Sequence, residues 1–107
     1  MASKSKAKGN TYERELVQQA TQMGIQAIRA WGSNGRSLGL SEEVDCLIAG
    51  YKVQAKRRAK IADYMVPSPQ VDVQIIRGDR GSSLAVIPYE LFLSFVKHQP
   101  KTSNNEQ

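Results

Sequence analysis

The sequence predicts a single α/β domain in which helices pack on a β-sheet, and three observations predict it. At 107 residues, 40% of them hydrophobic, the chain can bury one core and is short for two. Apolar residues recur at helical spacing near both ends, over residues 11–23 and 88–97. Shorter β-prone runs lie between these two segments. An α/β or α+β arrangement with helices covering a sheet accommodates this order.

The two ends of the chain differ in composition from the rest. Residues 1–8 are almost entirely alanine, serine and lysine, and residues 100–107 are polar without a large apolar side chain. Such segments cannot bury enough apolar surface to fold. We therefore expect a disordered basic tail over 1–8, a folded domain over 9–99 and a disordered polar tail over 100–107.

The first half of the domain is expected to contain one helix and three strands. An amphipathic helix over residues 11–23 would begin at a cap on Asn10 or Thr11 and stop at Gly24. A short strand over 25–30 follows, and the Gly- and Ser-rich segment 31–39 predicts a long polar loop without regular structure. Two runs, 44–48 and 51–55, are joined at Ala49–Gly50, which predicts a tight β-hairpin.

The second half begins with a basic run over 56–60. A short helical turn over 61–65 should end at Val66–Pro67–Ser68–Pro69, because prolines stop helices. Strands are expected over 71–76 and 84–87, with a turn at 78–81 between them. The last helix, 88–97, should have an apolar face of Leu91, Phe92, Phe95 and Val96.

The balance of charge points to a polyanionic partner. Lys and Arg number 15 against 10 Asp and Glu, a formal net charge of +5, which favours nucleic acid. The single cysteine, Cys46, cannot form an intramolecular disulfide and is expected to be a core residue, which indicates a reducing, cytoplasmic location. No segment has the apolar core of a signal peptide or the length of a membrane span. We expect no membrane partner.

Three residues of the predicted hairpin suggest hydrolytic chemistry. Folding back at Ala49–Gly50 would bring Asp45, at the start of one strand, near Gln54 and Lys56 at the end of the next. Carboxylate and amide oxygens can hold Mg²⁺, a hard cation, while a lysine can orient water or stabilise charge on a phosphate. Each residue alone could serve only a structural role at a strand end.

These motifs resemble those of a known superfamily. Val44-Asp45 followed by Val53-Gln54-Ala55-Lys56 is similar to the D…(E/Q)xK signature of PD-(D/E)xK nucleases, and a helix bearing Glu13 precedes it. Residues 8–16, KGNTYEREL, resemble the KGxxxEREL signature of archaeal-type Holliday-junction resolvases, which also occur in phages. Arg29 and Gly32-Ser33 match the arginine and serine that follow the first strand. The resemblance implies a restriction-endonuclease-like domain with a central mixed β-sheet flanked by helices.

The resemblance also implies roles for particular residues. Glu13, Asp45, Gln54 and the Ala55 carbonyl would hold Mg²⁺, for which Mn²⁺ could substitute, with Lys56 as the catalytic lysine. Arg14, Arg29 and Ser33 would lie near the scissile strand. The protein would act as a homodimer on four-way DNA junctions. Two departures are Gln54, where resolvases usually have Glu, and a longer loop between Arg29 and Asp45; the first bears on metal affinity and the second on substrate preference.

Several alternatives remain open at the level of sequence. Glu42 or Glu43 could replace a ligand, while Glu15 is expected to be structural and His98 to have no catalytic role. Trp31 could stack on a base or anchor its loop in the core, and Arg36 could contact DNA from the same loop. Basic side chains expected to bind DNA phosphates are Arg57, Arg58 and Lys60. The alternative functions are a nuclease for other branched or single-stranded DNA and a non-catalytic DNA-binding module.

Overall fold

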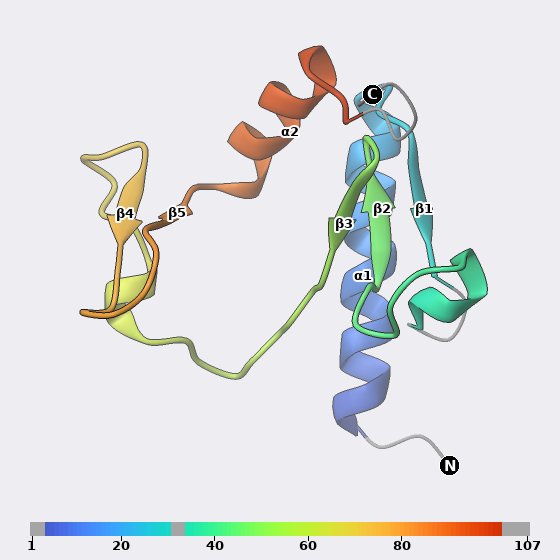
Figure 1. Ribbon diagram of the computed structural model, residues 1–107, viewed down its shortest axis with the longest axis horizontal. Helices are drawn as coiled ribbons and strands as arrows, with labels where there is room; N and C mark the ends of the chain where they lie inside the picture. Colours follow the sequence, from blue (N-terminus) through green and yellow to red (C-terminus); the bar gives the residue numbers. More distant parts are fainter. Residues whose placement is uncertain (1–3, 31–33, 102–107) are drawn as a thin grey trace. The chain divides into compact units, whose positions relative to one another are not determined.

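The computed structural model describes residues 4–30 and 34–101 (Figure 1). The elements in chain order are α1 (Lys4–Gln22), β1 (Ala27–Arg29), η2 (Gly35–Leu38), β2 (Cys46–Ile48), β3 (Tyr51–Val53), η3 (Asp63–Met65), β4 (Gln74–Ile76), β5 (Leu84–Val86) and α2 (Tyr89–His98). They confirm the α/β class.

The chain divides into two compact units. Unit 1 comprises Met1–Arg57 and Val96–Gln107, and unit 2 comprises Arg58–Phe95. Unit 1 contains the three-stranded sheet β1-β2-β3, and unit 2 the two-stranded sheet β4-β5. The extent of the folded domain, 9–99, stays a prediction.

Every strand pairing within the described ranges is antiparallel, so the expected mixed sheet is not found there. The connections explain this difference. Parallel neighbours need a crossover of a dozen or more residues, usually helical, whereas β2 and β3 are joined by a two-residue turn. That turn was predicted: Ala49 and Gly50 both have positive φ, 53° and 85°, as a type I′ hairpin requires.

Helix α1 differs from the prediction at its beginning and agrees at its end. It begins at Lys4, so part of the expected N-terminal tail is helical; alanine and lysine are strong helix formers, which the expected cap at Asn10 or Thr11 did not take into account. Gly24 ends the helix as predicted, with φ +79°. The N–H of Gly24 donates to the Thr21 carbonyl and that of Ile25 to the Ala20 carbonyl, which is a Schellman motif.

The core of unit 1 lies between α1 and the sheet. Helix α1 contacts β1 and β2 (Figure 1). Leu16 and Ala20 of α1 are buried, and so are Cys46 and Ile48, which alternate along β2 and therefore share one face. Cys46 is fully buried, as expected for a core residue. This packing fixes the start of β2 beneath α1.

The loop before β2 is more regular than expected. Gly35–Leu38 form a 3₁₀ turn that Asn34 caps by accepting a hydrogen bond from the Arg36 N–H. Gly35 is buried, and a Cβ there would collide with the Ser41 carbonyl, so the loop folds back closely on itself. The prediction of no regular structure was wrong because an Asn cap and small residues suffice for one short turn. The expectations for Trp31 and Ser33 lie outside the described residues.

The segment after α2 pairs with the β2–β3 turn. The Tyr51 hydroxyl donates to the Gln99 carbonyl, and the Lys101 N–H to the Ala49 carbonyl at 2.8 Å. A Cβ at Gly50 would collide with the Lys101 carbonyl. Lys101, expected in the polar tail, is therefore held against unit 1.

Unit 2 contains the predicted β4–β5 hairpin, and α2 follows it. The apolar face predicted for α2 is partly wrong: Leu93 and Val96 are buried, at 1% and 5% exposure, whereas Phe95 is 55% exposed. Leu93 and Val96 are one helical turn apart and so share a face. The predicted face was instead centred on the aromatic residues Phe92 and Phe95. No helix among residues 4–30 and 34–101 is long and apolar enough to cross a membrane.

Candidate active site

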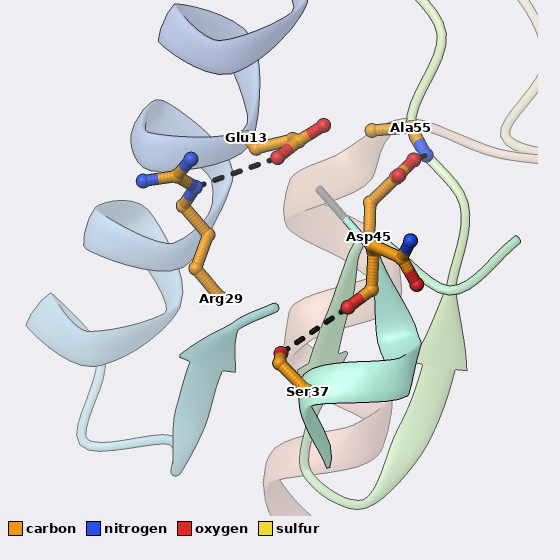
Figure 2. A network of polar contacts seen from close by, with 6 residues as sticks. Glu13, Arg29, Ser37, Asp45 and Ala55 are labelled. Carbon is orange, nitrogen blue, oxygen red and sulfur yellow. Dashed lines mark hydrogen bonds and ion pairs between the residues drawn. The ribbon is translucent and has the colours of Figure 1, made fainter. Parts of the chain in front are cut away.

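Glu13 is a charged residue on the buried face of α1. It lies one turn before Leu16 and two turns before Ala20, so helical geometry places it in line with the core, and it is only 4% exposed. An unpaired charge there would be strongly destabilised. Its Oε1 lies 3.4 Å from Nε of Arg29 on β1 (Figure 2). The neighbouring Glu15 is exposed, which agrees with the expectation that Glu13 and not Glu15 belongs to the site.

Asp45 immediately precedes β2, the central strand of the same sheet, and is held by both its backbone and its side chain. Its carbonyl accepts from the Ala30 N–H and its N–H donates to the Val53 carbonyl, each at 2.8 Å. Its Oδ2 accepts from the Ala55 N–H at 2.7 Å. Figure 2 shows Glu13 reaching from α1 toward the side of the sheet where Asp45 meets Ala55. The carboxylate thus has a fixed orientation beside the end of β3.

The Cys46 thiol lies in the electrostatic field of these charged groups. Its pKa is raised to about 11, first by burial and then by the negative charges of Glu13 and Asp45, while Arg29 acts in the opposite direction. Coulombic effects are stronger at the low dielectric of a buried site. The charges of Glu13, Asp45 and Arg29 therefore all act on the buried position at the start of β2.

Gln54 and Lys56 lie next to Asp45 along the chain that leaves β3. The hydrogen bonds of Asp45 to Val53 and Ala55 hold the residues on either side of Gln54, so the predicted approach of Asp45 to this segment is present. Both Gln54 and Lys56 are exposed. Their side chains are accessible to a ligand, and their roles stay predictions.

The remaining candidates are distributed over the surface. Arg14, Arg36, Arg57, Arg58 and Lys60 are all exposed. Arg36 pairs with Glu42 at 3.4 Å, with side-chain exposures of 74% and 64%, so this ion pair contributes little to stability. Arg29 differs from the others, because it is partly buried and pairs with Glu13 rather than standing free for DNA.

The structure limits the choice of metal ligands. Within the described ranges, no three His, Cys, Asp or Glu side chains lie close enough together to hold a metal ion, so neither Glu42 nor Glu43 joins Glu13 and Asp45 in such a group. A metal held by these two carboxylates would need neutral oxygen ligands as well. Gln54 and the Ala55 carbonyl are oxygen donors of that type.

Two features of the site were missed by sequence reasoning. The Ala55 N–H that orients Asp45 is a backbone donor, and no side-chain pattern reveals it. The need for a partner of Glu13 could have been anticipated, because a helix face that carries Glu13 together with Leu16 and Ala20 buries a charge. That this partner is Arg29 follows only from the packing of α1 on β1.

Comparison with known proteins yields one match. A family model described as archaeal Holliday junction resolvase (hjc) matches residues 4–66, more than half of the chain, and the matched segment ends before β4. No curated protein and no solved structure matches the chain.

Proposed function

This chain belongs to the archaeal Holliday junction resolvase family, and from that premise we propose that it is a metal-dependent endonuclease that cuts four-way DNA junctions. The observation that carries the proposal is the hydrogen bond from the Ala55 N–H to the Asp45 carboxylate, which fixes that carboxylate beside the segment that bears Gln54 and Lys56. Glu13 reaches from α1 toward the same side of the sheet (Figure 2). Two carboxylates, an amide and an ammonium group in one place suit hydrolysis of a phosphodiester.

The oxygen donors of the site fit a divalent cation such as Mg²⁺ or Mn²⁺. Glu13, Asp45, Gln54 and the Ala55 carbonyl would hold it, since hard cations prefer carboxylate and carbonyl oxygens. Such an ion would supply Lewis-acid activation of the phosphate and of the attacking water. The Ala55 N–H engages Oδ2 of Asp45 and leaves Oδ1 for a ligand. Arg29 holds Glu13 in one orientation in the same way.

Lys56 supplies the remaining chemistry. Its exposed ammonium group follows the Ala55 amide that contacts Asp45, so it can orient a water or stabilise charge that develops on the phosphate. Exposed arginines and lysines supply phosphate contacts: Arg14 on α1 and Arg57, Arg58 and Lys60 after β3.

A homodimer completes the proposal. Resolution of a four-way junction requires two symmetric cuts, and a protein with two-fold symmetry presents two equivalent sites. The expected products are paired nicks at symmetric positions on opposite strands.

The test is cleavage of a labelled four-way junction, with a linear duplex and a flap in competition. Asp45→Asn and Lys56→Ala should each lower the cleavage rate by about a hundredfold or more, because each removes a ligand or a catalytic group, while junction binding persists. Matched controls are Asp79→Asn and Lys52→Ala, which remove the same charges at exposed positions outside the proposed site. Normal cleavage by Asp45→Asn and Lys56→Ala would refute the site, and equal cleavage of all three substrates would indicate a general nuclease.

Gln54 favours a second candidate function, a DNA-binding module without catalysis. An amide lacks the negative charge of the glutamate usual at this position in resolvases, which weakens a metal site. Junction binding by the wild type, without cleavage in Mg²⁺ or Mn²⁺, would support this second function over the first.

A further inference from the structure

The η2 turn lies against the residue that precedes Asp45. A Cβ at Gly35 would come within 2.9 Å of the Val44 Cβ, and Val44 is buried. The turn is therefore held beside the start of β2, where the Asp45 carboxylate accepts from the Ala55 N–H. Figure 2 shows Ser37 of this turn below Asp45. The η2 turn thus belongs to the surroundings of the candidate active site.

Hydrogen bonds fix the position of Arg36 on this turn. Its N–H donates to Oδ1 of Asn34 at 2.9 Å, and its carbonyl accepts from the Gly39 N–H at 3.0 Å. The Leu40 N–H closes the turn by donating to the Gly35 carbonyl at 2.8 Å. The side chain of Arg36, in contrast, is 74% exposed. The turn therefore presents a cation to solvent beside the candidate active site.

Arg36 is paired with a carboxylate of its own loop. Its Nη2 lies 3.4 Å from Oε2 of Glu42, whose side chain is 64% exposed. Separation of an exposed pair leaves both ions in water, so the contact is easily broken. The Glu13–Arg29 pair, with side-chain exposures of 5% and 25%, differs because a separated charge there would be buried. The pair at η2 can therefore exchange partners at little cost.

A DNA phosphate is an anion well suited to replace Glu42. A guanidinium binds phosphate oxygens through two parallel N–H donors, and such charge-assisted contacts are stronger than neutral ones. Two anions at one guanidinium repel each other, so a phosphate and the Glu42 carboxylate compete for it. Arg36 and Glu42 both lie in unit 1, which carries the net positive charge of the chain. A phosphate attracted to unit 1 therefore meets an Arg36 that is already paired.

We propose that Glu42 competes with DNA for Arg36, and that a backbone phosphate at the η2 turn binds Arg36 by displacing the Glu42 carboxylate. The inference rests on the proposed function for the presence of DNA at the candidate active site. While Glu42 holds Arg36, DNA that only approaches unit 1 is not attracted by a free guanidinium at this turn. A phosphate in contact with the turn gains that guanidinium, so the exchange favours DNA that is engaged at the site.

Binding of a labelled four-way junction, measured by fluorescence anisotropy with EDTA present, tests the proposal in the absence of cleavage. Glu42→Gln should lower the dissociation constant about two- to fivefold more than Glu43→Gln does, which is the factor that an exposed ion pair contributes to an equilibrium. Glu43→Gln is the matched control, because it removes the same charge from the adjacent exposed residue. Glu43 forms no ion pair within residues 4–30 and 34–101.

The same two substitutions in an Arg36→Gln background separate competition from general repulsion. With the guanidinium removed, Glu42→Gln and Glu43→Gln should change the dissociation constant equally, because each then only removes a negative charge near DNA. The proposal is overturned if Glu42→Gln has no larger effect than Glu43→Gln in the wild-type background, or if its larger effect persists with Arg36→Gln. A wild type that binds junctions with the expected pattern but does not cleave them in Mg²⁺ or Mn²⁺ would refute the proposed cleavage alone. A wild type that binds no DNA would refute both.

Discussion

Glu13 is both a buried residue of the unit 1 core and a candidate metal ligand. A carboxylate on the inner face of α1 is stable there because Arg29 lies within ion-pair distance, and the pair is largely withdrawn from solvent. Truncation of either partner would leave a buried charge uncompensated, which usually costs about 3–5 kcal/mol. Arg29→Ala is thus a poor test of DNA binding, and Asp45 and Lys56 are better probes of the chemistry.

Gln54 is the residue whose substitution is most informative about the metal. Gln54→Glu adds a negative charge with almost no change in size, at an exposed position beside the Asp45–Ala55 hydrogen bond. The Mg²⁺ concentration for half-maximal cleavage should fall about tenfold or more, because cation affinity rises with ligand charge. The positions of the cuts should not change. Cleavage is measured against metal concentration for both proteins.

The control for Gln54 is Gln70→Glu, which adds the same charge at an exposed position in unit 2. Its metal curve should match that of the wild type. If Gln54→Glu also leaves the curve of an active enzyme unchanged, Gln54 is not a ligand.

At the scale of elements, local signals predicted most of the fold. Gly24 and Gly50 marked a helix end and a hairpin because a positive φ favours glycine. The 3₁₀ turn at Gly35–Leu38 and the pairing of Lys101 with Ala49 depend on contacts between segments, which periodicity does not encode. In the candidate site, the proximity of Asp45 to the end of β3 could be predicted from the hairpin alone. The partner of Glu13 required the packing of α1 on β1.

Alanine substitutions at Gly24 and Gly50, which have similar positive φ, distinguish the cost of backbone strain from the cost of a lost tertiary contact. Gly24→Ala should lower the free energy of unfolding by about 1–2 kcal/mol, the cost of a left-handed alanine, since nothing lies within 4 Å of its Cβ position. Gly50→Ala should lower it by about 1–3 kcal/mol more, because its Cβ also meets the Lys101 carbonyl. Urea denaturation of both variants measures the difference. Equal losses would mean that the Gln99–Lys101 segment does not pack on the turn in solution.

At the scale of the whole molecule, charge is divided unevenly between the two units. Unit 1 carries the net charge of +5 together with Glu13, Asp45, Gln54 and Lys56. Unit 2 has four basic and four acidic side chains and is neutral. The excess of cations that attracts DNA phosphates therefore lies in the unit that also holds the candidate active site.

The salt dependence of DNA binding tests whether the basic run after β3 contacts phosphates or only adds to the overall charge. The double variant Arg57→Gln, Arg58→Gln removes two exposed charges beside Lys56, and Arg77→Gln, Arg80→Gln removes two exposed charges at the β4–β5 turn. Both reduce the net charge of the chain equally, so long-range attraction falls by a similar amount.

If Arg57 and Arg58 each neutralise a phosphate, the slope of log affinity against log salt concentration on duplex DNA should fall in magnitude by about 1.8, at about 0.9 for each contact. The turn variant should keep the slope of the wild type, because Arg77 and Arg80 lie at the β4–β5 turn and not in the basic run that follows β3. Binding is measured by fluorescence anisotropy at several salt concentrations, at protein concentrations where all three proteins have the same oligomeric state. A wild-type slope for the Arg57, Arg58 variant, or an equal fall for both variants, would place the phosphate contacts elsewhere in the chain.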